Sequence, residues 1–367
     1  MRNVTVSAES DLKSTILELE IPEIGGKIGA LGSLPGLEVG ADSASIIIEL
    51  RLPAASLHES IRERVAEALA ERHGITRADI TIRTAITAHG VQRNLKPLDE
   101  VRNIIAVASG KGGVGKSTTA VNLALALAAE GARVGILDAD IYGPSVPLML
   151  GVPGARPTSE DGQSLTPLEA YGLQVMSIGF LIEADQPMVW RGPMVTQALA
   201  QMLQQTRWSD LDYLIVDMPP GTGDIQLTLS QQVPVSGAVI VTTPQDIALL
   251  DARKGLQMFR KVSVPVLGIV ENMSTHICTN CGHEEPIFGK GGGALMAAEY
   301  GVELLGQLPL DLEIRRNTDS GRPTVVGDPD SAPAVAYRLA ATRMAARLAL
   351  QGKDYSKKFP KIVVEES

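Results

Sequence analysis

Hydrophobic positions follow two different periods along the chain, and their alternation indicates the fold class of its larger part. Beyond about residue 100, short apolar runs alternate with longer segments of helical period. The apolar runs are Ile104–Ala108, Val134–Leu137, Tyr213–Val216, Ala238–Val241 and Val266–Val270, and the helical segments are Ser117–Glu130, Thr196–Gln205, Ile247–Val262 and Ala332–Leu350. Short buried strands that alternate with helices are typical of a parallel sheet covered on both faces. We therefore predict an α/β fold with a mostly parallel sheet between two layers of helices.

Residues 1–92 carry a different pattern, which predicts a separate small α+β domain. Ser45–Leu52 is rich in β-branched residues and Asp79–Thr84 alternates between apolar and polar positions, so both are predicted strands. Between them, Leu57–His73 has the apolar spacing of a helix. We predict a linker at 93–101, the α/β domain at 102–350 and a C-terminal tail at 351–367.

The composition narrows the classes of partner. The 367-residue chain is 44% hydrophobic, has a net charge of −9, and contains only 3% aromatic residues. A surface that stacks on bases needs aromatic side chains and one that coats DNA needs basic ones, so we expect no nucleic-acid partner. The sequence has no apolar stretch of about 18 residues, and Met1–Leu12 lacks the apolar core of a signal peptide. We therefore expect no membrane contact and a cytoplasmic location.

A glycine-rich segment directly after the first apolar run predicts a nucleotide site. Residues 110–117 read GKGGVGKS, which fits the G-x-x-x-x-G-K-[ST] P-loop between a strand and a helix. Glycines let backbone N–H groups point at phosphate oxygens, and the helix N-terminus adds its positive dipole end. Lys116 is expected to reach the β- and γ-phosphates of ATP, and Ser117 to hold Mg²⁺. The predicted nucleotide-binding residues of this segment are Gly110, Lys111, Gly112, Gly113, Val114, Gly115, Lys116, Ser117 and Thr118.

Two further apolar runs end in acidic residues. Val134–Leu137 is followed by Asp138 and Asp140, and Tyr213–Val216 is followed by Asp217. Because parallel strands place their carboxyl ends at the edge where the phosphate loop lies, these carboxylates are predicted to lie beside the nucleotide. Asp217 fits a role in Mg²⁺ binding, in which it orients a water on the metal. An aspartate at a strand end is also a common cap of a turn or helix, which is the alternative for each residue taken alone.

The P-loop contains a second lysine, Lys111. The sequence KGGVGKS resembles the deviant Walker A class of ATPases, which includes the MinD and ParA partition proteins and the nitrogenase iron protein. The resemblance implies that Lys111 reaches across a dimer interface to the nucleotide of the partner subunit. The alternative is an ordinary solvated surface lysine.

The two cysteines of the chain, Cys278 and Cys281, form a C-x-x-C-Gly turn. A thioredoxin-like redox pair needs its first cysteine at a helix N-terminus, and residues 282–286 (GHEEP) do not predict a helix. Metal binding fits better, yet zinc and [4Fe–4S] sites usually take four ligands. A two-fold axis would supply the second pair of thiolates, which indicates a homodimer. His276 and His283 could instead complete a zinc site within one chain.

Together these motifs resemble those of the Mrp-type (ApbC-type) iron–sulfur cluster carrier ATPases. The matching segments, which extend over most of residues 102–350, are ASGKGGVGKST, LDADIYGPSVPLMLG, Arg191–Met194, VDMPPGTGD, VENMS, CTNCG and Phe288–Gly293, and the tail Tyr355–Val364 is similar as well. The resemblance implies that Cys278 and Cys281 of two subunits hold one [4Fe–4S] cluster, which passes to apo iron–sulfur proteins under the control of ATP. It also implies that Asn272 contacts adenine and that Asp138 and Asp140 lie in switch I, where Asp140 positions the attacking water.

Residues 1–92 resemble the small iron–sulfur assembly domain that is often joined to these ATPases. That domain usually carries a cysteine in the turn before its helix, but the turn here, Pro53–Leu57, reads PAASL and has none. We therefore expect this domain to supply no cluster ligand, and to dock either a partner or the ATPase domain.

The sequence thus predicts an ATPase that carries a [4Fe–4S] cluster, with Lys111, Lys116 and Asp140 as its catalytic residues. Two other functions share the same motifs. A MinD/ParA-like positioning ATPase would need a membrane helix or a basic DNA surface, and the short tail with Pro360 is a poor membrane helix. A zinc-stapled dimeric scaffold that uses ATP as a switch would use the same cysteines but hold no iron.

Overall fold

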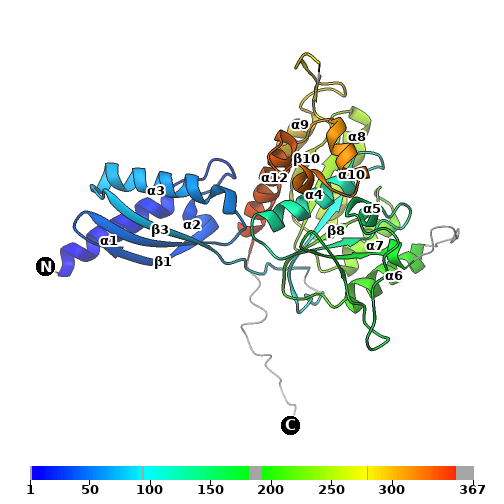
Figure 1. The fold of residues 1–367 in the computed structure, drawn as a ribbon, viewed down its shortest axis with the longest axis horizontal. Helices are drawn as coiled ribbons and strands as arrows, with labels where there is room; N and C mark the ends of the chain where they lie inside the picture. The colour runs from blue at the N-terminus through cyan, green and yellow to red at the C-terminus, as the bar shows by residue number, and fades with distance from the viewer. Residues whose placement is uncertain (1, 93–94, 182–191, 279, 353–367) are drawn as a thin grey trace, which may run out of the picture.

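The computed structural model describes residues 2–92, 95–181, 192–278 and 280–352. A small sheet with its own helices lies to one side of a larger α/β unit (Figure 1). Parts of four predicted features lie outside the described residues: 93–94 of the linker, Arg191 of the Arg191–Met194 motif, Thr279 of the cysteine turn, and 353–367 of the tail.

The larger unit is built on an eight-stranded sheet. Its strands are β4 (Val101–Ala108), β5 (Val134–Asp138), β6 (Leu168–Ala170), β7 (Leu173–Ser177), β8 (Leu211–Asp217), β9 (Gly237–Thr242), β10 (Val266–Glu271) and β13 (Leu304–Gln307). They lie in the order β13-β10-β9-β4-β8-β5-β7-β6, and every neighbouring pair is parallel except β6 and β7. The predicted mostly parallel sheet is confirmed.

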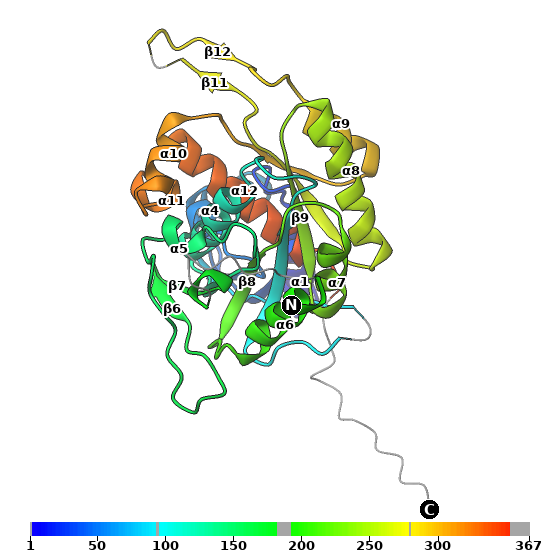
Figure 2. The same cartoon turned by 90° about the vertical axis from the view of Figure 1, so that its right-hand side faces the viewer.

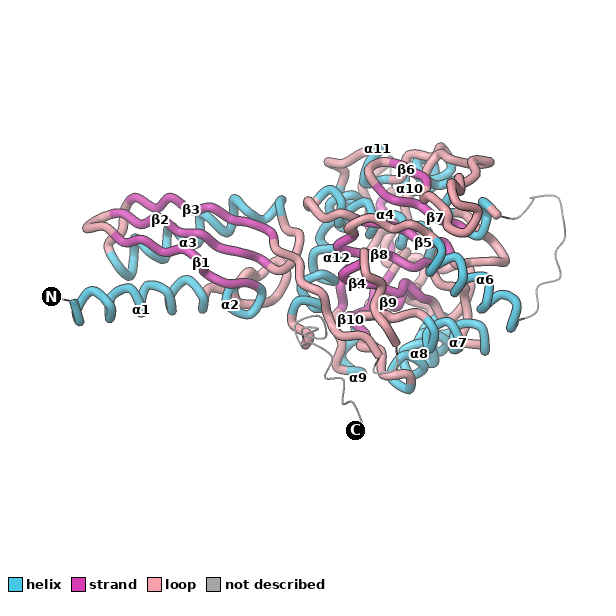
Figure 3. Tube along the Cα trace, turned by 90° about the horizontal axis from the view of Figure 1, so that it is seen from below, coloured by secondary structure: helices cyan, strands magenta, loops and turns pink. Residues whose placement is uncertain are grey.

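Helices cover both faces of this sheet (Figures 2 and 3). On one face lie α4 (Lys116–Ala129), α5 (Val146–Met149), α10 (Leu312–Asp319), α11 (Thr324–Gly327) and α12 (Ala332–Ala349), and on the other lie α6 (Gly192–Gln205), α7 (Asp224–Gln232), α8 (Asp246–Lys261) and α9 (Gly292–Tyr300). All residues of β5, β8 and β9 are buried, as strands covered from both sides must be. The alternation of apolar runs and helical segments therefore translates directly into a three-layer arrangement.

The smaller unit has a three-stranded sheet. Its elements are α1 (Arg2–Glu18), α2 (Ile28–Leu31), β1 (Gly32–Val39), β2 (Ser43–Leu50), a 3₁₀ turn (Ala55–Leu57), α3 (His58–His73) and β3 (Arg77–Thr84). β2 is antiparallel to β1 and parallel to β3. Ile46 and Ile48 of β2 and Val65 and Leu69 of α3 are buried in its core.

The hydrophobic pattern missed several elements of both units. β1 has a proline and a glycine at 35 and 36, and its pairing with β2 shifts register between Ser33 and Gly36. Proline and irregular pairing are tolerated there because β1 is an edge strand. The predicted strand Ser45–Leu52 is observed two residues earlier, at Ser43–Leu50. β7 and β13 are short and were not predicted.

Hydrogen bonds join the small unit to the larger one. The buried carboxylate of Glu130, at the end of α4, accepts the backbone N–H of Ser56 at 2.8 Å. From α12, the guanidinium of Arg343 donates to the carbonyl of Glu23 at 2.8 Å. The turn that lacks the expected cysteine therefore lies against the larger unit. The division at residues 92 and 102 stays a prediction.

The chain enters and leaves the larger unit at one place. The N–H of Gly90, before β4, lies 3.4 Å from the carbonyl oxygen of Gly352, after α12. Two residues after Gly90, the side chain of Gln92 donates to the carbonyl of Ser230 in α7 at 2.8 Å. No helix in the described ranges is long and apolar enough to cross a membrane.

Candidate functional site

The P-loop, residues 109–115, joins the central strand β4 to α4. Gly115 has φ +78°, a left-handed conformation that favours glycine, and a Cβ there would lie 2.2 Å from the side-chain nitrogen of Asn272. A Cβ on Gly110 would lie 2.1 Å from the backbone of Asp251 in α8. The loop is thus held between two other segments, and only glycine fits at these two positions.

Lys116, the first residue of α4, lies among carboxylates. Its side chain is 5% exposed, and its Nζ lies 2.5 Å from Oδ1 of Asp217 and 3.6 Å from Oδ2 of Asp140. It also donates to the hydroxyl of Ser117 at 3.1 Å. The predicted phosphate-binding lysine and two of the three predicted acidic residues, Asp140 and Asp217, therefore meet in one buried cluster at the carboxyl edge of the sheet.

Asp138 is fully buried beside this cluster, opposite Asp217 in the register of β5 and β8. Its carboxylate accepts the N–H groups of Asp140 at 3.1 Å and Val146 at 3.2 Å, and the hydroxyl of Ser177 at 3.0 Å. Burial, reinforced by the negative charge of Asp217, raises the pKa of Asp138 to about 7. Both of its oxygens are used to hold the loop that follows β5, so Asp138 organises the segment that carries Asp140.

Two carboxylate oxygens in this cluster remain available for a ligand. Oδ1 of Asp140 and Oδ2 of Asp217 are buried and have no hydrogen-bond partner among the described residues. Burial raises the pKa of Asp140, while the ammonium of Lys116 opposes this shift. Hard cations prefer oxygen donors, and the hydroxyl of Ser117 lies at the same place. This donor set fits Mg²⁺, which would supply positive charge next to transferring phosphates.

Lys111 lies on the outer side of the P-loop. It is half-buried, and its side chain makes no hydrogen bond or ion pair with the part of the chain that the structure describes. Its carbonyl oxygen accepts the hydroxyl of Ser109 at 2.8 Å, which fixes the backbone at this point. Next to it, Gly112 and Gly113 are exposed. A lysine whose side chain has no partner among the described residues is available to a ligand or to another subunit.

Asn272 follows β10 and contacts the P-loop directly. Its side-chain nitrogen donates to the carbonyl of Val114 at 2.9 Å, and its side-chain oxygen accepts the N–H of Met273 at 3.0 Å. Met273 has φ +57°, which is uncommon for a residue other than glycine. The structure thus places Asn272 at the nucleotide loop, as a clamp on its backbone. Its predicted contact with adenine stays a prediction.

Cys278 and Cys281 lie at the turn of a small hairpin, formed by β11 (His276–Ile277) and β12 (Glu284–Glu285), that projects from the larger unit (Figure 2). The N–H of Cys278 donates to the carbonyl of His283, and the N–H of Gly282 donates to the carbonyl of Cys278. Backbone N–H groups of Asn280 and Cys281 lower the pKa of the Cys278 thiol, which favours the thiolate that binds metals. A strand, not a helix, follows the turn, in agreement with the sequence.

The hairpin does not assemble a metal site from one chain. Cys278 is half-buried and Cys281 is exposed. No three histidine, cysteine or acidic side chains come together as metal ligands anywhere in the described ranges. His276 instead has its Nδ1 2.9 Å from the carbonyl oxygen of Leu310. The structure therefore gives no support to a zinc site completed by His276 and His283.

Apolar side chains are exposed on this hairpin and on the two helices α8 and α9. Ile277 and Ile287 lie on its two arms and are 53% and 51% exposed, and Leu295 of α9 is 71% exposed. On α8, Ile247 and Leu250 are also exposed. Large exposed apolar side chains that gather near one feature are typical of a contact surface.

Sequence reasoning missed a buried acidic residue next to Asn272: Glu271, the last residue of β10. It is fully buried, and its carboxylate accepts the N–H of Gly293 and, at 2.8 Å, the side-chain amide of Gln307. The same signal that identified Asp138 and Asp217, an acidic residue at the end of an apolar run, was present at Glu271 in the segment VENMS.

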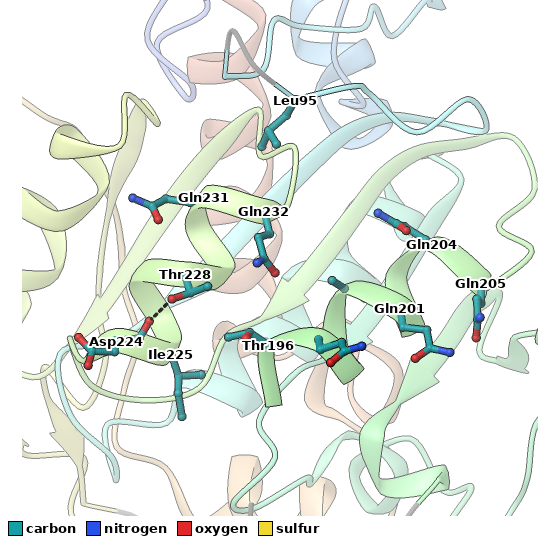
Figure 4. A pocket seen from close by; sticks show the side chains of 12 residues that line it. Leu95, Thr196, Gln201, Gln204, Gln205, Asp224, Ile225, Thr228, Gln231 and Gln232 are labelled. Atoms are coloured by element: carbon teal, nitrogen blue, oxygen red, sulfur yellow. Dashed lines mark hydrogen bonds between the residues drawn. The ribbon is translucent and has the colours of Figure 1, made fainter. Parts of the chain in front are cut away.

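A groove of about 1090 Å³ lies between α6 and α7 (Figure 4). Asp224, Ile225 and Thr228 of α7 and Leu95 lie along it, and glutamine side chains of both helices make up much of the rest. Asp224 begins α7 directly after the loop that follows Asp217. No predicted site residue lines the groove.

Known proteins with this arrangement are found at high similarity. A family model described as ParA, NUBPL iron-transfer P-loop NTPase, matches residues 100–345. An iron-sulfur cluster carrier protein of Escherichia coli strain K12 is 57% identical over 308 residues, which cover 83% of this chain and 84% of that protein. Another, from Haemophilus influenzae, is 51% identical over 352 residues and covers 95% of both chains.

A solved structure agrees with these relatives. A nucleotide-binding protein from Archaeoglobus fulgidus, in complex with ADP, is 38% identical and superposes with a TM-score of 0.57 over 64% of this chain and 91% of that one. The matched family segment begins just before β4 and ends within α12, so it contains the whole eight-stranded sheet, the P-loop and the cysteine hairpin. The chain therefore belongs to the ParA/NUBPL family of iron-transfer P-loop NTPases.

Proposed function

We propose that this chain is an ATP-dependent carrier of iron–sulfur clusters that works as a homodimer. One observation carries the proposal: two free cysteines lie at the tip of a projecting hairpin on a P-loop NTPase, and no third ligand joins them among the described residues. A [4Fe–4S] cluster takes four external thiolates, so two such hairpins would complete one site. The names of the curated relatives support cluster transport as the task.

In this proposal the buried cluster around Lys116 hydrolyses ATP. Lys116 would exchange Asp217 for the β- and γ-phosphates, and Ser117 and Asp217 would hold Mg²⁺, which would supply positive charge beside those phosphates. Asp140 orients the water that attacks the γ-phosphate, and ADP and inorganic phosphate leave. The unpartnered oxygen of Asp140 and its raised pKa support this role, because such a carboxylate can accept a hydrogen bond or a proton from water. Asn272 holds the loop from the side of β10.

Two features of the surface support the proposed dimer. Lys111 has no partner in its own described chain and is assigned to the nucleotide of the other subunit. The exposed apolar side chains near the hairpin, Ile277, Ile287 and Leu295, would be covered when two hairpins meet. Exposed charged residues of the same segment, Glu284, Glu285 and Lys290, would lie at the rim of such a contact.

The proposed partners are apo iron–sulfur proteins, and we place the protein in the cytoplasm without a nucleic-acid or membrane partner. We also assign residues 1–92 as a domain of its own, joined by the linker 93–101 to the ATPase domain 102–350, with 351–367 as a tail. The contact of Ser56 with Glu130 supports a role for the first domain in docking on the ATPase domain.

Anaerobic reconstitution tests the proposal. The protein, loaded with iron and sulfide, should hold about four iron atoms per dimer and show a broad charge-transfer absorption. Cys278→Ser and Cys281→Ser should each abolish stable iron binding, because each removes two of the four thiolates from the dimer. Both variants should still bind ATP, since the P-loop lies on a different segment. Iron, sulfide and zinc are measured together with the mass of the particle in solution.

Two results would contradict this assignment. A monomer that holds a full cluster would exclude the bridging site. Stoichiometric zinc without affinity for iron would favour the zinc-stapled scaffold. The cysteine hairpin has no use in a positioning ATPase, and no observation on the described residues favours that function.

A further inference from the structure

A single stretch of chain, residues 271–278, joins the nucleotide site to the cysteine turn. Near its start, Asn272 donates to the carbonyl of Val114 in the P-loop at 2.9 Å. At its end, Cys278 begins the turn of the hairpin. Between them, Ser274 and Thr275 form backbone hydrogen bonds of 2.9 and 2.7 Å with Leu308 and Leu310, the residues after β13. Fewer than ten residues of hydrogen-bonded backbone therefore connect the P-loop contact to the cysteines.

The buried carboxylate of Glu271 lies at the root of this stretch. One oxygen accepts the N–H of Gly293, the second residue of α9, and the other accepts the amide of Gln307 at 2.8 Å. α9 has no capping side chain from its own N-cap residue, Gly291. Glu271 therefore supplies the acceptor and the negative charge that the N-terminus of this helix requires. The fit is close, because a Cβ on Gly293 would lie 2.9 Å from the Cβ of Glu271.

The bond between Glu271 and Gly293 matters for the hairpin because Gly293 lies where the chain returns from it. The chain leaves the sheet at Glu271, runs out through the cysteine turn, and returns into α9 at Gly292. The Glu271–Gly293 bond closes this excursion between residues 22 positions apart. Glu271 thus begins the hairpin segment and is also bonded to its end at Gly293. Glu271 directly precedes Asn272, which contacts the P-loop.

We propose that Glu271 is a positioning residue that couples the nucleotide state to the cysteine hairpin. Movement of the P-loop is passed by Asn272 to the end of β10, and the carboxylate of Glu271 makes both ends of the hairpin segment follow that movement together. This coupling deepens the carrier function proposed above and rests on it. Without the carboxylate, the hairpin keeps its cysteines, yet the orientation of the hairpin no longer depends on what the P-loop binds.

Hydrogen–deuterium exchange on the full-length, cluster-free protein tests the coupling. In the wild type, Mg²⁺ with a non-hydrolysable ATP analogue should change exchange at residues 276–293 relative to Mg²⁺ with ADP. In Glu271→Ala, exchange there should be about ten- to a hundredfold faster with either nucleotide, because a buried charge-assisted hydrogen bond that resists local opening is lost. The difference between the two nucleotides should disappear, while the affinity for both should stay within about twofold.

Two further variants separate coupling from general destabilisation. In Glu271→Gln, the side-chain oxygen still accepts the N–H of Gly293. The new amide nitrogen can donate to Gln307 once the amide of Gln307 rotates, so this variant should retain the nucleotide response. Ser331 caps α12, which lies on the opposite face of the sheet, and its hydroxyl accepts the N–H of Ala334. Ser331→Ala removes this cap. It should lower stability without affecting residues 276–293. If Glu271→Ala does not fold, Glu271→Gln should still exchange faster there than Ser331→Ala, because its neutral hydrogen bond is weaker.

The proposal is overturned if wild-type exchange at 276–293 does not respond to nucleotide, or if Glu271→Ala keeps the wild-type response. It is equally overturned if Glu271→Gln and Ser331→Ala cannot be told apart in the fallback comparison. No cluster is present in the exchange experiment. It therefore still tests the coupling if the reconstitution experiment shows that the protein binds no cluster. A second arm on loaded protein measures the rate of iron release to a chelator, which should depend on nucleotide in the wild type and not in Glu271→Ala.

Discussion

Individual side chains in the nucleotide site illustrate how burial prepares them for a ligand. Lys116 is surrounded by Asp140 and Asp217, and Asp138 lies fully buried behind them. Asp140 and Asp217 share the single ammonium of Lys116, so the cluster lacks a second positive charge. A buried charge without enough compensation is costly, so the arrangement favours the arrival of Mg²⁺.

Substitutions of Lys116 and Asp140 should separate binding from hydrolysis. Lys116→Ala removes the charge that reaches the phosphates, so ATP binding should weaken and hydrolysis should stop. Asp140→Ala leaves the P-loop intact, so ATP should bind with nearly wild-type affinity while turnover falls by about a hundredfold or more, the usual contribution of such a group. Equilibrium binding and phosphate release measure the two effects. Wild-type turnover in Asp140→Ala would exclude its assignment to the attacking water.

The raised pKa of Asp138 predicts a pH dependence of stability. Its folded-state pKa is about 7, above the ordinary value near 4, so the protonated form is favoured by folding. This contribution is fully present below about pH 4 and is lost as pH rises towards 7. In nucleotide-free protein, the fall in Tm between about pH 5 and 8 should therefore be smaller in Asp138→Asn than in the wild type. Identical pH profiles of Tm would show that Asp138 does not titrate in this range.

Among the elements, those with a strong hydrophobic period were predicted and those held by partners were not. The central strands and α4, α8 and α12 follow from apolar spacing alone. β1 carries a proline and a glycine that only an edge position tolerates, and β13 is four residues long. In the site, the P-loop and the strand-end aspartates were predicted from residue type. The pairing of Glu271 with Gly293 was not, because only the folded hairpin brings those two residues together.

The contact between α4 and the small unit can be tested through Glu130. Glu130→Ala leaves the N–H of Ser56 without its acceptor, so residues 53–58 should exchange their amide hydrogens faster, by an amount that corresponds to about 1–3 kcal/mol. Glu63→Ala, an exposed substitution on α3, is the matched control and should leave these amides unchanged. Equal exchange in Glu130→Ala and the control would mean that the bond does not hold the two units together.

At the scale of the whole molecule, the P-loop edge and the cysteine hairpin lie at the same end of the large sheet, as expected if one dimer contact serves both. β4, β8 and β10 all end at this edge because they are parallel. The small unit contacts the C-terminal end of α4 and Arg343 of α12, and it leaves the exposed side chains of α8 and α9 uncovered. The chain thus keeps one end for its ligands and another for its attachments.

Mixed dimers can show whether Lys111 acts across the interface. One subunit carries both Lys116→Ala, which prevents ATP use, and Lys111→Ala, and its partner is wild type. If Lys111 acts in trans, the single working site lacks its lysine and hydrolysis should be nearly absent. A control dimer, in which the defective subunit carries Lys116→Ala alone, should keep the activity of that one site. Equal rates of ATP hydrolysis in the two dimers would exclude a trans role.

The adjacency of Gly90 and Gly352 has a consequence for how this ATPase can be combined with other modules. The chain enters and leaves the larger unit at one point, on the edge of the sheet where β4 starts. A domain joined before or after this unit is therefore attached at the end of β4 opposite to the P-loop. Modules can therefore be added, lost or exchanged at either terminus without re-routing any strand. Such additions would leave the edge of the sheet with the P-loop and the cysteine hairpin accessible.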